Sequence, residues 1–271
     1  MKKDFLICID SDGCAMDTMN IKHKKCFGPV LVKVWELKDY ESKILNLWDK
    51  VNLYSINRGI NRFKGLALVL QEINDKYKEI EGLDELKLWV DSSKELSNRA
   101  LEEKLKNSNS EALSKALTWS RASNEKIDSL LDEVEAFEYV GEALKKANAL
   151  ADVVVISSAN EEALHREWSK ENLINEVKAI MSQETGSKSH CIKELLKEGY
   201  DAKRILMIGD TSEDLKAAQE NGILYYPIMV GKEKECWKQL VEKDIYYFFT
   251  DSFKGEYENS LIGNFYDNLA I

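Results

Sequence analysis

The sequence predicts an α/β fold in which a parallel sheet core carries an inserted all-α domain. Three apolar runs, at 5–9, 153–156 and 205–208, each end abruptly in polar residues, which is the pattern of strands buried on both faces of a parallel sheet. Between the later runs the apolar spacing is helical, so strand and helix alternate there. Residues 19–135 show helical spacing without comparable strand runs.

Each predicted strand has a place in this arrangement. The first, at 5–9, has no partner near it in the sequence, so it must pair with strands far along the chain. Two further apolar runs, at 177–181 and 223–229, are candidates for the remaining strands. We therefore expect a core domain formed by 1–18 and 136–271, and a helical domain formed by 19–135.

The composition excludes several classes of protein. With 44% hydrophobic residues, 13 Gly and 2 Pro, the chain is too apolar for a disordered protein and too poor in turn formers for an all-β sandwich. Acidic residues outnumber basic ones by 48 to 38, so the net charge is -10. This balance predicts no general attraction to nucleic acid or to an anionic membrane.

Cysteine usage and apolar run lengths bear on the compartment. The chain has 5 cysteines, an odd number with no Cys-x-x-Cys pair, which fits a reducing compartment better than a disulfide framework or a zinc cluster. The N-terminal apolar run is too short for a signal peptide, and no later stretch approaches the roughly 20 apolar residues of a membrane span. We expect a cytoplasmic protein, and the sequence leaves its oligomeric state open.

Polar side chains follow the three main strands at the point where each strand ends. Asp10 and Asp12 follow the first, Ser157 and Ser158 the second, and Asp210 with Asp214 the third. The carboxyl ends of parallel strands meet at one edge of the sheet, where ligands of open α/β sheets bind, so we expect these groups to converge. Clustered carboxylates repel one another, and a hard divalent cation, most simply Mg²⁺, resolves this repulsion with oxygen ligands.

A cationic side chain is expected to balance the remaining negative charge. Lys188 stands at the start of a helix predicted at 189–197, and this position makes it our candidate for the balancing cation. Lys178, Lys193 and Lys197 lie nearby in the sequence and are the competing candidates.

Four motifs stand in a fixed order along the chain. They are Asp-x-Asp-Gly at 10–13 followed by Asp17 and Thr18, the apolar strand ending in Ser157, the lone Lys188, and Gly-Asp-x-x-x-Asp at 209–214. In this order they resemble the motifs of the haloacid dehalogenase superfamily, in the type whose helical cap is inserted after the first motif. The resemblance covers the whole core and implies a Rossmann-like sheet with a mobile cap. Cys14 stands where the family pattern more often has threonine, so a hydroxyl expected after Gly13 is missing.

The resemblance implies a division of labour among these residues. Asp10 would attack phosphorus and carry an aspartyl-phosphate, and Asp12 would protonate the leaving oxygen and then deprotonate the hydrolytic water. Ser157 and the backbone N–H groups near Ser158 would bind the transferring phosphoryl oxygens.

The same resemblance implies how Mg²⁺ would be held. Asp210 would bind the ion together with Asp10 and the backbone carbonyl of Asp12. Asp214 would either bind it through water or orient Lys188.

The implied function is Mg²⁺-dependent hydrolysis of a small phosphomonoester. Enzymes of the superfamily that cleave carbon–halogen bonds usually lack the second aspartate, so Asp12 favours phosphoryl chemistry. A phosphomutase, a phosphonate-cleaving enzyme, and a non-catalytic phosphate-ligand sensor or partner-binding protein remain as alternatives. Taken singly, the segment at 209–214 also fits an ordinary helix N-cap. A calcium loop at 10–21 is excluded, because that pattern needs Gly and Glu where Ala15 and Ile21 stand.

The helical domain offers two further candidates. Arg58 and Arg62 are spaced i, i+4, which in a helix would place them on one face, where they could bind a carboxylate or a second phosphate of the substrate. The alternative is a solvated face with surface ion pairs. His23 and Cys26 could suggest a metal site, but a lone pair without further ligands is more often ordinary packing.

Overall fold

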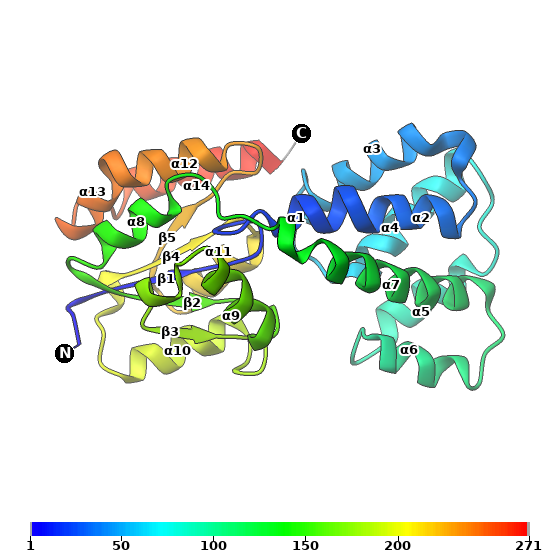
Figure 1. The fold of residues 1–271 in the computed structure, drawn as a ribbon, viewed down its shortest axis with the longest axis horizontal. Coiled ribbons are helices and arrows are strands. Elements are labelled where there is room, and N and C mark those ends of the chain that lie inside the picture. The colour runs from blue at the N-terminus through cyan, green and yellow to red at the C-terminus, as the bar shows by residue number, and fades with distance from the viewer. Residues whose placement is uncertain (1, 270–271) are drawn as a thin grey trace. The chain divides into compact units, whose positions relative to one another are not determined.

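The computed structural model describes residues 2–269 and contains a five-stranded parallel sheet in the order β3-β2-β1-β4-β5 (Figure 1). The strands are β1 (Phe5–Ile9), β2 (Ala151–Ile156), β3 (Ala179–Met181), β4 (Ile205–Gly209) and β5 (Leu224–Pro227). The predicted fold class is confirmed, and all five apolar runs form strands. In the centre of the sheet Ile7 lies opposite Val153 of β2 and Leu206 of β4.

The central strands are buried because helices cover the sheet. Every residue of β1, β2 and β4 is buried, as expected for continuous apolar runs in a parallel sheet. Right-handed crossovers, the rule for parallel strands, place α8 (Val140–Ala147) and α9 (Glu161–Lys170) on one face. They place α10 (Lys188–Lys197) and α11 (Ser212–Glu220) on the other face, where these two helices pack against each other.

The remaining elements around the sheet are short helices and the C-terminal helices. They are α1 (Thr18–Asn20), η4 (Ile174–Glu176), η5 (Ala202–Arg204), α12 (Glu233–Gln239), η6 (Leu240–Asp244), α13 (Ile245–Phe249) and α14 (Glu256–Leu269). Helix α14 packs against the edge strand β5, so the C-terminal segment covers that side of the sheet.

The chain divides into two compact units, one formed by Met1–Met19 and Val134–Ile271, the other by Asn20–Glu133. We call them the α/β unit and the helical unit. The elements of the helical unit are η1 (Ile21–Phe27), α2 (Gly28–Val34), η2 (Lys38–Tyr40), α3 (Glu41–Asn52), α4 (Arg62–Lys76), α5 (Leu83–Ser92), α6 (Asn98–Leu105), α7 (Glu111–Leu130) and η3 (Leu131–Glu133). The domain boundaries at 18/19 and 135/136 remain our proposal for the domain organisation.

The helical unit has its own apolar core, built around aromatic side chains. Trp48 and Trp119 are buried at its centre with ring centroids 5.7 Å apart, and Phe27 and Phe63 pack edge-on or tilted against Trp119. The indole of Trp119 donates a hydrogen bond to the carbonyl of Phe27 at 3.0 Å, which satisfies its buried N–H.

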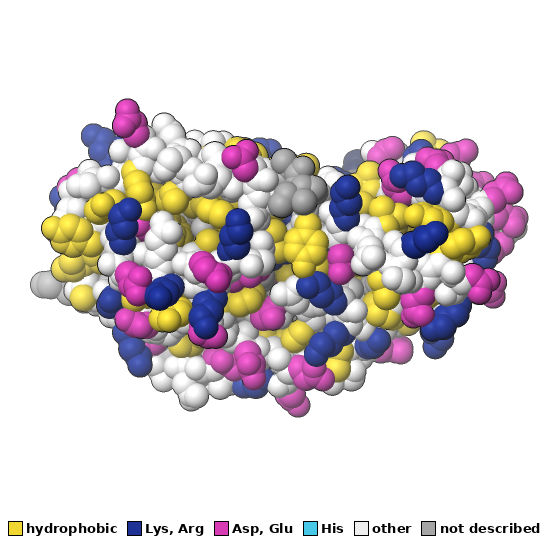
Figure 2. Space-filling model, turned by 90° about the horizontal axis from the view of Figure 1, so that it is seen from above, with side chains coloured by type: hydrophobic (Ala, Val, Ile, Leu, Met, Phe, Trp, Pro, Cys, Tyr) yellow, Lys and Arg dark blue, Asp and Glu magenta, His cyan; other side chains and the backbone are white. Residues whose placement is uncertain are grey.

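The surface carries charges of both signs. On the face drawn in Figure 2, lysine and arginine side chains are interspersed with aspartate and glutamate side chains. Pairs such as Lys76 with Glu72 in α4 and Lys115 with Glu111 in α7 connect neighbouring turns of one helix, and exposed pairs of this kind stabilise a protein by only about 0–1 kcal/mol. Among the described residues, every helix is too short or too polar to cross a bilayer.

Candidate active site

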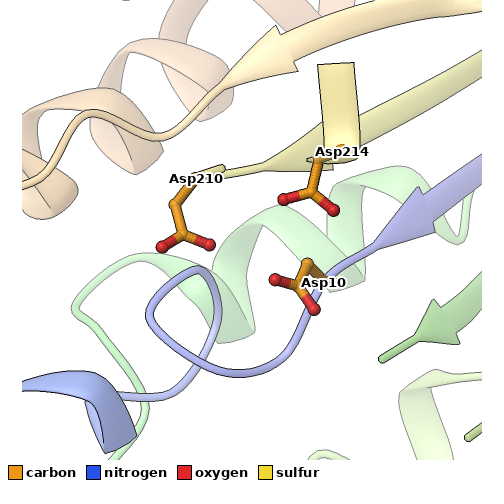
Figure 3. A group of neighbouring side chains, drawn as sticks. All are labelled: Asp10, Asp210 and Asp214. Carbon is orange, nitrogen blue, oxygen red and sulfur yellow. The ribbon is translucent and has the colours of Figure 1, made fainter. Parts of the chain in front are cut away.

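Three aspartates meet at the carboxyl edge of the sheet (Figure 3). Asp10 follows the last residue of β1, Asp210 follows the last residue of β4, and Asp214 lies in the first turn of α11. Since β1 and β4 are neighbours, their ends bring these residues together, and one oxygen of each carboxylate lies within 4.8 Å of the others. All three side chains are buried, and in Figure 3 their carboxylates point toward one another.

Lys188 supplies a positive charge to this cluster. Its Nζ atom lies 2.9 Å from Oδ2 of Asp10 and 2.6 Å from Oδ1 of Asp214, and its side chain is only 10% exposed. The competing Lys178 lies elsewhere, where it contacts Asp152 near the amino end of β2. Lys188 reaches the cluster because it is the first residue of α10, whose N-cap is Ser187.

The electrostatics of the cluster follow from burial and from the excess of negative charge. Burial raises the pKa of Asp10 well above its ordinary value, and Asp214 and Asp210 raise it further, whereas Lys188 opposes the rise. Burial works against the charged form of Lys188, but the attraction of Asp10 and Asp214 outweighs it, and the pKa of Lys188 is raised. The lysine therefore remains charged and offsets part of the negative charge of the cluster.

The start of α11 fixes the position of Asp214. Thr211 is the N-cap, and its hydroxyl oxygen accepts a hydrogen bond from the backbone N–H of Asp214, while Oδ2 of Asp214 accepts from the backbone N–H of Thr211. The motif therefore forms a helix N-cap, and Oδ1 of Asp214 still accepts a hydrogen bond from Lys188. Gly209 is required beside it, because a Cβ atom there would lie 2.3 Å from Cγ of Asp214.

The loop after β1 carries Asp12, which is half-buried. Thr18 donates its hydroxyl hydrogen to Oδ1 of Asp12 at 2.6 Å, which orients this carboxyl group. Gly13 has a φ of 79°, a conformation that side chains with a Cβ atom rarely adopt, so the tight turn needs glycine here. Cys14 is fully buried, and burial, followed by the nearby Asp210 and Asp10, raises the pKa of its thiol.

Ser157 and Ser158 follow β2 at the same edge of the sheet. Ser157 is buried, and its Oγ accepts a hydrogen bond from the backbone N–H of Ala159 at 3.2 Å. That bond leaves the hydroxyl hydrogen of Ser157 able to donate. Ser158 is exposed.

The structure corrects the expected helix at Arg58 and Arg62. Arg58 lies in a turn closed by Gly59, whose φ is 84°, and α4 begins only at Arg62, so the two arginines do not share a helix face. Asn61 is the N-cap of α4, and its side chain accepts from the backbone N–H of Phe63. The asparagine therefore starts the helix at a place where the i, i+4 spacing suggested continuity.

Both arginines contact neutral groups of the helical unit. Arg58 is buried and donates to the carbonyl of Leu53 at 3.4 Å. Arg62 donates to Oδ1 of Asn124 at 2.5 Å, and its guanidinium lies 5.7 Å from the ring centre of Phe27. Burial lowers the pKa of Arg62.

His23, considered above with Cys26, has a packing role. Its Nδ1 accepts a hydrogen bond from the indole of Trp48 at 3.1 Å, so this nitrogen is already used. Cys26 is buried.

Several residues that shape the site were not singled out from the sequence. The spacing of Thr211 and Asp214 is that of a capping box and could have identified the threonine. Trp168 and Trp237 have no such local signal, because the atoms they contact in the loop after β1 are 157 and 223 residues away in the sequence.

The donor set fits a hard divalent cation. Three buried carboxylates and one ammonium group leave an excess of two negative charges when all are ionised. Oxygen ligands in this number suit Mg²⁺, which binds through a few carboxylates and keeps several waters.

Two solved structures share the fold of this chain. A candidate haloacid dehalogenase-like hydrolase from Bacteroides fragilis has a TM-score of 0.52 at 12% identity, covering 86% of this chain and 93% of that chain. A candidate phosphoglycolate phosphatase from Lactobacillus delbrueckii subsp. bulgaricus has a TM-score of 0.51 at 11% identity, covering 82% of this chain and 85% of that chain. At these identities the likeness shows the fold alone.

Sequence comparison gives the family. A search among curated proteins finds no significant match. The family model of haloacid dehalogenase-like hydrolases matches residues 68–227, which is more than half of the chain. The matched segment contains β2, Lys188 and the Gly-Asp-x-x-x-Asp motif, and it begins after the loop that follows β1. This chain belongs to the haloacid dehalogenase-like hydrolase family.

Proposed function

We propose that the chain is a Mg²⁺-dependent phosphatase that hydrolyses a small phosphomonoester through an aspartyl-phosphate on Asp10. The observation that carries this proposal is the buried cluster of Asp10, Asp210 and Asp214, in which the ammonium group of Lys188 contacts Asp10 and Asp214. A structural role alone does not need three buried carboxylates at a ligand-binding edge, since buried ion pairs contribute little net stability.

Asp10 is proposed as the nucleophile. A carboxylate oxygen of Asp10 forms a bond to phosphorus while the bond to the leaving oxygen breaks, and Asp12 gives its proton to that oxygen. A water molecule then attacks the same phosphorus atom, transfers a proton to Asp12 and releases Asp10 with inorganic phosphate. The hydrogen bond from Thr18 to Oδ1 of Asp12 supports this assignment, because it holds the acid/base in one orientation.

Lys188 and the serines after β2 are proposed to bind the phosphoryl oxygens. Lys188 orients Asp10 at 2.9 Å and adds positive charge where negative charge develops. Ser157 has a hydroxyl hydrogen to donate, and the backbone N–H of Ser158 follows it at the end of the strand as a second proposed donor.

Mg²⁺ would be held by Asp10, Asp210 and the backbone carbonyl of Asp12, with Asp214 beside it. When bound, the ion would neutralise the excess negative charge of the cluster and of the phosphoryl group. Asp214 already pairs with Lys188, which favours orientation of the lysine as its main role.

Arg58 and Arg62 are proposed to recognise the part of the substrate remote from the phosphate. Arg62 is the stronger case, because burial lowers its pKa and its contacts in the protein are neutral. Arg62→Ala should lower kcat/KM for the natural substrate. The corresponding rise in activation free energy should be at most a few kcal/mol, roughly the scale of charged hydrogen bonds, whereas kcat/KM for an aryl phosphate should stay nearly unchanged. Equal losses on both substrates would instead indicate a folding role.

The test of the function is phosphate release from a panel of phosphorylated sugars, nucleotides and organic acids in the presence of Mg²⁺. We expect turnover of at least one compound, loss of turnover in excess chelator, and recovery with Mg²⁺ but poorly with Ca²⁺, whose coordination shell is larger and looser. Full activity in excess chelator, or no turnover of any phosphoester by a well-folded sample, contradicts the proposal. The cytoplasmic location stays a prediction.

A further inference from the structure

Two buried tryptophans hydrogen-bond to the loop that follows β1. The indole N–H of Trp168, in α9, donates to Oγ of Ser11 at 3.0 Å, and the indole N–H of Trp237, in α12, donates to the carbonyl of Cys14 at 2.9 Å. Both tryptophans and both loop residues are fully buried. Helix α9 joins β2 to β3 on one side of β1 in the strand order, and α12 follows β5 on the other side, so the loop is held from elements on both sides.

Ser11 is the residue on which the geometry of this loop depends. Its carbonyl accepts hydrogen bonds from the backbone N–H groups of Ala15 at 3.0 Å and Met16 at 2.9 Å. Its own backbone N–H donates to Oδ1 of Asp10 at 2.8 Å. A shift of Ser11 therefore moves both the turn and the carboxylate of Asp10.

These contacts are specific, because a buried indole in this protein does not always find a partner. The indole nitrogen of Trp35 is buried and has no hydrogen-bond partner among the described residues. An indole has one N–H donor, so each tryptophan beside the loop uses its whole hydrogen-bonding capacity on that loop.

We infer that Trp168 and Trp237 are positioning residues that hold the loop carrying Asp10 and Asp12 in its reactive geometry. The inference rests on the proposed function for its kinetic readout. Each tryptophan acts through the loop: Trp168 through the side chain of Ser11, and Trp237 through the backbone of Cys14.

Removal of each indole N–H tests the inference. Trp168→Phe and Trp237→Phe keep a buried ring and lose the donor, and Ser11→Ala removes the acceptor used by Trp168. We expect each variant to lower kcat for 4-nitrophenyl phosphate about tenfold to a hundredfold, the scale of a small displacement of reacting groups, with KM within about twofold. The double variant Trp168→Phe with Ser11→Ala should lose little more than either single variant, because both remove the same hydrogen bond.

Trp119→Phe in the helical unit is the matched control. It deletes an equally buried indole donor, the one that contacts the carbonyl of Phe27, and should lower stability while kcat for the aryl phosphate stays within about twofold. Replacing the indole by benzothiophene, through β-(3-benzothienyl)alanine at position 168 or 237, keeps the bicyclic volume and should reproduce the loss of kcat if a phenylalanine variant fails to fold. An unchanged kcat in these variants overturns the inference.

Hydrogen exchange separates failure of this inference from failure of the proposed function. The amides of Ala15 and Met16, which donate to Ser11, should exchange about tenfold faster in Trp168→Phe, the loss expected from one buried hydrogen bond, and unchanged in Trp119→Phe. If the wild-type protein hydrolyses no phosphoester, the proposed function fails, and this exchange measurement still decides whether the indole holds the loop. Equal exchange in wild type and Trp168→Phe overturns the positioning role.

Discussion

Four charged side chains are clustered at the carboxyl edge of the sheet. Asp10, Asp210 and Asp214 would repel one another without a cation, and Lys188 neutralises only part of their charge. Burying like charges together costs folding free energy. Clusters of this kind are therefore found mainly at functional sites, where the chemistry needs them. The same cost makes each of the four side chains sensitive to substitution.

Asp10→Asn should abolish turnover, because the amide keeps the shape of the side chain and removes the attacking carboxylate. No acid-stable, hydroxylamine-sensitive phosphoenzyme should form from a labelled substrate. In metal-free buffer the variant should melt at a higher temperature than the wild type, since one of three mutually repelling carboxylates is gone, by roughly 2–4 °C for each kcal/mol gained. Ordinary activity in Asp10→Asn would show that Asp10 is not the nucleophile.

Lys188→Met and Lys178→Met form a matched pair that distinguishes the two lysines. Lys188→Met leaves Asp10 and Asp214 without their ammonium partner, so we expect loss of turnover and a stability loss of about 3–5 kcal/mol in urea unfolding. Lys178→Met should keep kcat, because Lys178 contacts Asp152 and lies near the amino end of β2. If only Lys178→Met lost activity, Lys178 and not Lys188 would be the lysine that the reaction needs.

At the scale of elements, the strand ends explain how much of the site could be predicted. The apolar runs identified the strands, and parallel pairing then brings the residue after β1 next to the residue after β4. The helix that was expected to carry Arg58 and Arg62 fails for a local reason, since Asn61 caps α4 and Gly59 turns the chain before it. Contacts such as that of Trp237 with the loop could not be predicted, because no local pattern encodes a partner 223 residues away.

A second network ties the sheet together near the opposite, amino end of its strands. Asp152 is the charged residue within the otherwise apolar β2, and its Oδ2 accepts hydrogen bonds from Tyr200 at 2.5 Å, Lys178 at 2.9 Å and the backbone N–H of Lys3 at 3.2 Å. Burial acts to raise the pKa of Asp152, but the hydrogen bonds from Tyr200 and Lys178 outweigh it, and the pKa is lowered. This carboxylate thus joins β2 to the segments before β1, β3 and β4.

Asp152→Asn should destabilise the protein by about 1–3 kcal/mol at pH 7, the cost of disturbing a buried charged hydrogen-bond network. Because the folded-state pKa of Asp152 lies below its ordinary value of 3.8, the stabilisation is fully present above that value and is lost as the pH falls through the folded-state pKa. Urea unfolding at a series of pH values should therefore show that the difference in unfolding free energy between variant and wild type becomes smaller below about pH 4. Asp4→Asn, at a side chain that is 85% exposed, is the control and should change little. If this difference in unfolding free energy does not depend on pH, the ionised carboxylate of Asp152 does not stabilise the fold.

At the scale of the whole molecule, each of the two units has its own apolar core. The three aspartates and Lys188 belong to the α/β unit, whereas the aromatic cluster around Trp119 belongs to the helical unit. Local opening in one core does not require opening of the other, so a ligand that binds one unit should protect that unit first. The helical unit therefore provides an internal reference in the same chain.

Mg²⁺ should slow amide hydrogen exchange in the α/β unit, most strongly in the loop after β1 and around Thr211, and should leave the helical unit nearly unchanged. The reason is that the ion offsets the repulsion among carboxylates contributed by β1, β4 and α11, and so stabilises the elements that carry them. At a concentration a hundredfold above its dissociation constant the stabilisation should approach about 2.7 kcal/mol. Exchange followed by mass spectrometry with and without Mg²⁺ measures both units in one experiment, and Asp210→Asn should remove the effect. Equal protection of both units, or an undiminished effect in Asp210→Asn, would place the ion somewhere other than this cluster.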